Sequence, residues 1–500
     1  MTHGRAVRSA IVLLALAAAP LRGQCPDGSP PPCRGSIRAA VPPTSLAVLY
    51  FENASHDSAD AYLADGITEE IISRLSEVGR LQVKSRYQVR RYRTDSTENT
   101  AEIGRQLAVA RIVTGSVRRA GNRLRVTAEM VRTATGDVVW SERYDRADND
   151  VLSLQGDLAS AVATAVTGRL LPAERQALAA QPTRNPAAYD AYLLGRYYWG
   201  RRTAADLVIA ASHFEQAIRA DSTYALAWSG LADAYVLFLP SEYDVPGINP
   251  DSILTLGEHA TRRALALAPQ LGEPYTSLGE ILEYRLQWTE ARAAFERGVA
   301  LSPRYPTAHL WYGYDLMVWN RWEDAVREID VARQLDPLSI VTIVSLAAAY
   351  DGAERVREAT ATFEQAKVLA PDHPLVLIFA SIHDLARRDY DRLAVDFPHL
   401  LRVTGMDSAA AADLERRLRD PAQRDAALRE TADRPGRVSW RALVYRALDG
   451  DDRMIQYLSE VDRDPKRTDV VSLLYCGCLG PLRTDPRMLA LLRRFGFPVP

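Results

Sequence analysis

Two consecutive segments, RYPTAHLWYGYDLMVWNRWEDAVREIDVARQLDP (304–337) and LSIVTIVSLAAAYDGAERVREATATFEQAKVLAP (338–371), have equal length and end on the same residue. Together with Pro303, their final prolines stand 34 residues apart. Small and bulky residues keep this step: the series are Gly279, Gly313 and Ala347; Ala291, Ala325 and Ala359; Gly298, Ala332 and Ala366; Phe295, Ile329 and Phe363. A fixed period with small and large residues in constant phase predicts a stack of similar units.

A 34-residue unit with this pattern resembles the tetratricopeptide repeat, a helix–turn–helix unit. The resemblance implies an all-α solenoid over 185–405 that binds other proteins. Two less regular units precede the strict run, and the loop Leu239–Pro250 interrupts the second of them. A degenerate sixth unit covers about 375–405, where Leu393 replaces the expected alanine. We expect 406–500 to form a helical cap.

The chain before the repeats predicts a compact α/β domain over 44–171. Hydrophobic periods and turn residues predict its elements in the order strand 46–51, helix 60–78, strand 81–84, helix 100–107, strands 111–118 and 123–132, strand 138–143 and helix 151–171. Leu124, Val126, Ala128 and Met130 alternate with polar residues, which predicts one buried face. The predicted fold class is therefore an α/β N-terminal domain plus an all-α tetratricopeptide solenoid, mostly helical overall.

Four separated segments of this domain resemble the TolB amino-terminal-like domain. They are SLAVLYFEN (45–53), YLADGITEEIISRLS (62–76), EIGRQLAVARIVTGSVRRAGNRLRVTAEMV (102–131) and TGDVVWSERYDR (135–146). The family often has proline where this chain has Tyr50. It commonly precedes tetratricopeptide repeats, often behind a cyclase or a winged-helix DNA-binding domain, and we find neither module in this sequence.

The N-terminus predicts export. Two arginines precede a short hydrophobic run, which is typical of a secretory signal peptide over 1–23, followed by a Pro/Gly-rich linker over 24–43. A retained membrane anchor is the alternative. The expected location is periplasmic or extracellular, with membrane association only through a retained N-terminal segment.

Four cysteines allow three pairings. Cys25 and Cys33 could close a small proline-rich loop, whereas we expect Cys476 and Cys478 to be too close in sequence for an easy mutual bridge. Metal binding by all four would require the two ends of the chain to meet.

No sequence motif predicts catalysis, a cofactor or a metal. The chain has no GxxxxGK, GxGxxG, HExxH or GxSxG motif, and the histidines are scattered, which is typical of satisfied or surface side chains. We interpret Glu69, Glu70 and Glu77 as acidic residues that favour the start of a helix. The competing hypothesis, a hydrolase, requires a deep pocket with a perturbed carboxylate near Asp65 or Glu69.

A basic run comprises Lys84, Arg86, Arg90, Arg91 and Arg93. With arginines of the 111–132 strands it could form a positive face for an acidic polymer, but charged residues on a solvated strand edge explain it as well. The formal net charge of −2 indicates no general attraction to nucleic acid, and we expect no nucleic-acid partner.

The repeat phase also predicts which residues face the concave groove. The predicted binding residues are Tyr192, Arg196, Trp199, Asp233, Glu280, Glu283, Tyr314 and Met317. This aromatic and acidic set favours a protein or peptide segment that carries some positive charge, unless the groove is filled by the chain's own C-terminal part. The sequence therefore favours an exported non-enzymatic scaffold. The alternative is a sensory or regulatory module of an envelope signalling system that lacks its own output domain.

Overall fold

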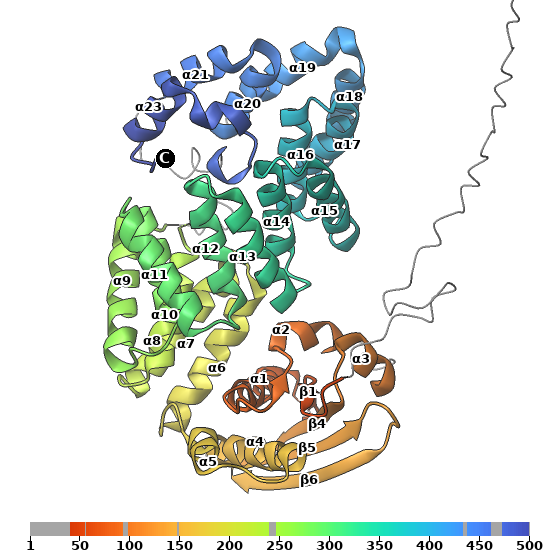
Figure 1. Cartoon of the computed structure of the whole chain (residues 1–500), viewed down its shortest axis with the longest axis vertical. Helices are drawn as coiled ribbons and strands as arrows, with labels where there is room; N and C mark the ends of the chain where they lie inside the picture. Colours follow the sequence, from red (N-terminus) through yellow and green to blue (C-terminus); the bar gives the residue numbers. More distant parts are fainter. Residues whose placement is uncertain are drawn as a thin grey trace, which may run out of the picture. The chain divides into compact units, whose positions relative to one another are not determined.

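The computed structural model describes residues 41–55, 57–93, 99–147, 150–239, 247–433, 438–461 and 473–499. The predicted signal peptide, most of the predicted linker, Cys25 and Cys33 lie outside these residues. Pro43–Pro500 forms one compact unit, which holds a small α/β region followed by a long series of helix pairs (Figure 1).

Within its described residues, the α/β region is built on a six-stranded sheet in the order β3-β1-β4-β5-β6, with β2 paired to β4. β1 is parallel to β3 and β4, whereas β4, β5 and β6 form an antiparallel meander. Its elements are β1 Ser45–Val48, β2 Glu52–Asn53, η1 Ser58–Asp60, α1 Ala61–Ser76, β3 Gln82–Val83, α2 Arg86–Val89, η2 Arg90–Arg93, α3 Thr100–Leu107, β4 Arg111–Ala120, β5 Arg123–Arg132, β6 Val138–Ala147, α4 Val151–Thr167 and α5 Pro172–Ala179.

The predicted alternation along β5 is confirmed, because Leu124, Val126, Ala128 and Met130 are fully buried. They belong to a core that also contains the inner faces of α1 and α4. The short elements β2, α2 and η2 were not predicted, since two to four residues are too few to show a period.

Six helix pairs form the solenoid in the part of the chain that the structure describes (Figure 1). They are α6 Pro186–Arg201 with α7 Ala204–Ala220, α8 Ala225–Val236 with α9 Pro250–Leu267, α10 Glu273–Tyr284 with α11 Trp288–Leu301, α12 Pro306–Val318 with α13 Trp322–Leu335, α14 Ile340–Gly352 with α15 Val356–Leu369, and α16 Pro374–Arg387 with α17 Tyr390–Val403. The small residues of the repeat make room for the bulky ones: the ring of Phe295 fills the space where a Cβ of Gly279 would lie.

The turns inside the last four pairs share one backbone conformation, although the residue types differ. Leu286, Asn320, Glu354 and Arg388, again 34 residues apart, all have a left-handed backbone with φ between 58° and 62°. In each, the backbone amide donates to the carbonyl three residues earlier, and the next amide donates to the carbonyl five residues earlier. These paired bonds close the end of the first helix, so four different side chains tolerate the strain.

The chain after the solenoid continues as helices and then returns to it. The elements are α18 Ser408–Arg419, α19 Pro421–Asp433, α20 Val438–Asp449, α21 Asp451–Glu460, η4 Gly480–Thr484 and α23 Pro486–Arg494. Residues of the last two elements share a hydrophobic core with Trp288 of α11 and Val318 of α12. The predicted helical cap therefore also packs back onto the third and fourth pairs.

The α/β region and the solenoid are joined by specific contacts. The hydroxyl of Tyr62 on α1 donates to Asp190 of α6 at 2.6 Å. The hydroxyl of Ser85 donates to the carbonyl of Leu335 of α13 at 2.9 Å. Helix α6 also contributes Tyr189 to the core of the α/β region.

Candidate functional site

A cavity of about 990 Å³ lies along the first helices of the repeats. Its walls come from α6, α8, α10, α12 and α14, from α1, α2 and η2 of the α/β region, and from the C-terminal segment 473–499. Cavities of this volume are at the upper end of the range that holds drug-sized ligands.

All eight residues predicted for the groove line this cavity. They are Tyr192, Arg196, Trp199, Asp233, Glu280, Glu283, Tyr314 and Met317. The structure thus brings them together on the wall of one space, although Met317 is only 1% exposed and contributes little accessible surface.

Two arginines enclose the Trp199 ring at one end of the cavity. The guanidinium carbon of Arg196 lies 4.4 Å from the ring centroid, and that of Arg202 lies 3.8 Å from it. The indole Nε1 of Trp199 is buried and has no hydrogen-bond partner within the described part of the chain. Next to them, burial raises the pKa of Asp233 to about 6, against the opposing charge of Arg196.

The interpretation of Glu69 and Glu70 as helix-start residues is wrong. Helix α1 begins at Ala61, so both residues lie in its third turn, beyond the reach of the helix-end charge. Glu69 instead accepts hydrogen bonds from the Tyr50 hydroxyl at 3.0 Å and from Arg86 at 2.8 Å. Burial would raise the pKa of Glu69, but Arg86 and Arg196 outweigh it and lower that pKa.

The basic run is neither a strand edge nor a single positive face. Residues 86–93 form α2 and η2, and Arg86, Arg90 and Arg93 line the cavity. Arg93 forms an ion pair with Asp65. On the β4–β5 hairpin, Arg123 and Arg125 instead share Asp145. These arginines therefore belong to two separate sets of ion pairs. The sequence did not reveal this separation, because the acidic partners are distant along the chain.

The cavity is large enough for the hydrolase hypothesis, but the two carboxylates that this hypothesis names, Glu69 and Asp65, are ion-paired with Arg86 and Arg93. Burial raises the pKa of Asp65 to about 6, opposed by its partner Arg93. Within the described residues no group of three or more potential ligands could hold a metal ion. The histidines that the structure describes include satisfied ones: His383 lies 2.6 Å from Asp351 and 3.1 Å from Thr360.

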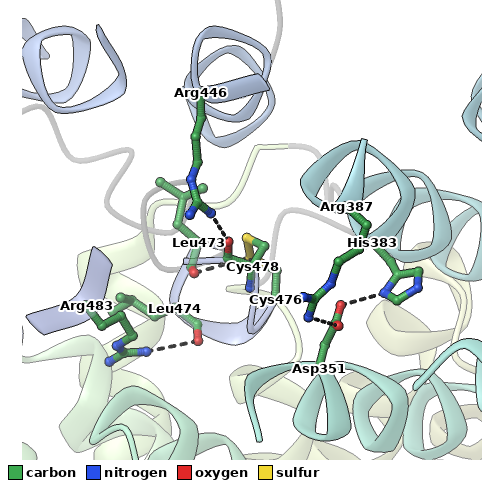
Figure 2. The surroundings of a disulfide bond; sticks show 9 residues. All are labelled: Asp351, His383, Arg387, Arg446, Leu473, Leu474, Cys476, Cys478 and Arg483. Carbon is green, nitrogen blue, oxygen red and sulfur yellow. Dashed lines mark hydrogen bonds and ion pairs between the residues drawn. A yellow bond between two sulfur atoms is a disulfide. The ribbon is translucent and has the colours of Figure 1, made fainter. Parts of the chain in front are cut away.

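The C-terminal segment closes part of the groove. The buried guanidinium of Arg483 donates to the carbonyls of Met317 and Val318 at the end of α12. It also donates to the carbonyl of Leu474 (Figure 2). The ring of Tyr475 lies 5.3 Å from that of Tyr314. The alternative in which the chain's own C-terminal part fills the groove is therefore realised for one portion of it, while the cavity remains beside it.

The expectation that Cys476 and Cys478 lie too close in sequence for an easy mutual bridge is wrong, because they form a disulfide with a Cα–Cα distance of 5.1 Å (Figure 2). Gly477 between them has φ +64°, a left-handed backbone conformation that glycine adopts without steric cost. A Cβ on Gly477 would lie 2.3 Å from the backbone nitrogen of Gly352. The turn packs directly on the backbone of α14, so there is no room for a side chain at this position.

Several cavity residues were not predicted. Tyr50, Arg86 and Asp65 come from the α/β region, and Tyr475 and Phe497 come from the C-terminal segment. One signal did exist, since Tyr50 is a departure from the family that the domain resembles. No local pattern indicates that the two distant segments reach the groove.

Residues 43–161 match the family model of the second domain of HilA/YgeH-like transcriptional regulators. The chain is also similar to a protein of Rhizobium meliloti (strain 1021) named "Putative adenylate cyclase 3", with 37% identity over 166 residues. That match covers 32% of this chain and 28% of the relative, so the chain spans less than a third of the relative's length.

Solved structures of repeat proteins are similar in fold. A thermophilic TPR protein of Thermus thermophilus is 19% identical with a TM-score of 0.31, covering 37% of this chain and 92% of its own. Yeast Tom70 is 16% identical with a TM-score of 0.36, covering 61% of this chain and 67% of its own. Among the residues with described structure, no helix has the length and hydropathy to cross a membrane.

Proposed function

We propose that the protein is an exported, non-enzymatic scaffold that binds a segment of a partner protein in the cavity along α6–α14. One observation carries this proposal: the helix faces selected by the repeat phase enclose a single cavity with aromatic and charged walls. Aromatic side chains can anchor a partner segment, and the charged groups beside them can set its direction. The ion pairs of Glu69 with Arg86 and of Asp65 with Arg93 support a binding role over catalysis by these two carboxylates.

The α/β region contributes residues to the wall of the same cavity. We infer that it is a TolB amino-terminal-like domain, on the four sequence segments that resemble that family. Its Arg86 and Tyr50 line the cavity, so the domain contributes to the binding surface of the solenoid.

Site-specific photo-crosslinking tests the proposal. A photoreactive amino acid at Tyr314, which lines the cavity, should capture one identified partner segment from cell-envelope extract. The same amino acid at Tyr312, which lies on the same helix outside the cavity lining and donates to Glu296, should not capture it. Equal capture at both positions, or capture of unrelated proteins only, would contradict the proposal.

A sensory or regulatory module is the second candidate. It is favoured by the similarity of residues 43–161 to a domain of transcriptional regulators and by the cyclase name of the relative. In that case the captured partner should itself be a cyclase, a kinase or a DNA-binding regulator. An envelope structural protein as the sole partner would favour the scaffold.

Secretion is tested by the mass of the protein recovered from the periplasm or the medium. The proposal predicts a chain shortened near residue 23. A full-length chain in the membrane fraction would instead support a retained anchor.

A further inference from the structure

The cavity has an acidic corner at the end of α10. Its walls are Glu280, Glu283 and Tyr284 of α10, Tyr314 of α12 and Tyr475 of the C-terminal segment. These residues also interact electrostatically. Burial raises the pKa of Tyr475 most, and the neighbouring Glu283, Glu280, Tyr284 and Tyr314 raise it further.

Glu283 is the buried centre of this corner. The residue is only 5% exposed, and its Oε1 has no hydrogen-bond partner among the described residues. Its other oxygen contacts Asp315, which already accepts hydrogen bonds from Arg292 at 2.8 Å and from Trp319 at 3.1 Å. Asp315 is therefore satisfied as an anion, and a proton on Glu283 is needed for the carboxyl–carboxylate contact.

We propose that this corner binds one cationic group, the guanidinium or ammonium of a basic side chain in the partner segment. Three tyrosine rings line the corner, and aromatic rings attract cations. Glu283 Oε1 supplies an acceptor that the described part of the fold leaves unused. This inference rests on the proposed function, because it specifies the chemistry of the same partner segment.

Charge balance gives the site a measurable signature. When the cation enters, the O–H bond of Glu283 breaks and the proton leaves to solvent, so that a carboxylate faces the cation. Burial, then Glu280 and Asp315, raise the pKa of Glu283 well above its ordinary value, and Arg292 opposes them. Affinity should therefore rise with pH until Glu283 is ionised without ligand.

The residues at the α6 end of the cavity disfavour a cation there, so they help to set the orientation of the bound segment. Arg196 and Arg202 flank Trp199 there and repel a second cation. Within the described residues, Trp199 Nε1 is an unused donor rather than an acceptor. A basic side chain is thereby directed to α10 and not to α6.

An array of short random peptides probed with the purified full-length protein tests the inference. Bound peptides should be enriched in arginine or lysine, and replacing the basic residue with neutral citrulline or norleucine should weaken binding by roughly tenfold. Calorimetry in phosphate and in Tris should show about one proton released per peptide.

Glu283→Gln should cause a similar roughly tenfold loss and abolish proton release. The substitution keeps the shape of the side chain. The thermal unfolding midpoint of the variant shows whether it is folded. Asp384→Asn is the matched control: Asp384 is similarly buried and also has an oxygen without a partner among the described residues, but it does not line the cavity. It should bind peptides as the wild type does.

The outcomes separate the two proposals. Tight peptides without a basic residue, or unchanged binding and proton release in Glu283→Gln, would overturn the cationic subsite and leave the cavity function standing. Absence of any bound peptide, together with no position-dependent crosslink at Tyr314, would overturn the proposed function itself.

Discussion

The two ends of the concave face differ although both are built from the same repeat. Near the ends of α10, α12 and α14, residues 473–499 pack on this face through Phe497, Arg483 and Gly477 and supply one wall of the cavity. Near α6 and α8 the cavity is lined by residues of the solenoid itself, including Trp199 and Asp233. The repeat phase therefore identifies an inner surface, but a distant segment decides whether that surface is core or binding site.

The largest expected effect separates buried from half-buried aromatic residues of the cavity wall. Trp288 donates from Nε1 to the Gly496 carbonyl at 2.7 Å and packs on Phe497. Trp288→Ala should lower the free energy of unfolding by about 3–5 kcal/mol, because it leaves a cavity in this core. Tyr197→Ala, at a half-buried position of the same cavity wall, should cost about 1 kcal/mol. Urea unfolding followed by circular dichroism measures both, and equal losses would remove the distinction.

A second test concerns the turn that presses on α14. Gly477→Ala should destabilise the fold by about 2–4 kcal/mol, because it combines a left-handed backbone with a clash against the Gly352 nitrogen. Gly405→Ala is the control, since Gly405 has φ +107° with open space around it and should cost only about 1–2 kcal/mol. Unfolding midpoints of the two variants should differ accordingly. A milder Gly477 variant would mean that the covering segment is not tightly seated.

The disulfide should stabilise this covered end only modestly. A bridge over so short a loop removes little entropy from the unfolded chain, about 1.5 kcal/mol. The double variant Cys476→Ser with Cys478→Ser should lose about that amount, and wild-type protein with reductant should match it. Loss of the whole transition on reduction would show that the bridge is essential to the segment.

The smallest expected effect is a pH dependence that distinguishes two buried carboxyl groups, Asp384 on α16 and Asp233 on α8. Burial raises the pKa of Asp384 to about 8. The folded chain then holds a proton that the unfolded chain has released, so this contribution to stability falls as pH rises from about 4 to 8. Asp384→Asn should therefore raise the free energy of unfolding by about 1 kcal/mol more near pH 8.5 than near pH 6.

Asp233 should respond in the same sense but over a lower pH range. Burial raises its pKa to about 6, so this loss of stability is nearly complete by pH 6, and the effect of Asp233→Asn should change little between pH 6 and pH 8.5. Chemical unfolding at both pH values provides the comparison. Parallel behaviour of the two variants would contradict the assigned environments.

Periodic features could be predicted from the sequence because they are local. The helix at Thr100–Leu107 is confirmed at both ends, and the buried face of β5 follows from alternation alone. The positions of the eight groove residues could be derived in the same way, since residues in one repeat phase must share one side of a stack.

Only the tertiary structure decided what those residues meet. The place of Arg86 and Tyr50 in the cavity wall, the pairing of Cys476 with Cys478, and the seat of Arg483 at the end of α12 all depend on segments far apart in the chain. Such contacts depend on how far the solenoid turns and where the chain returns. A period in the sequence contains neither quantity, because it describes each repeat relative to its neighbours and not to distant segments.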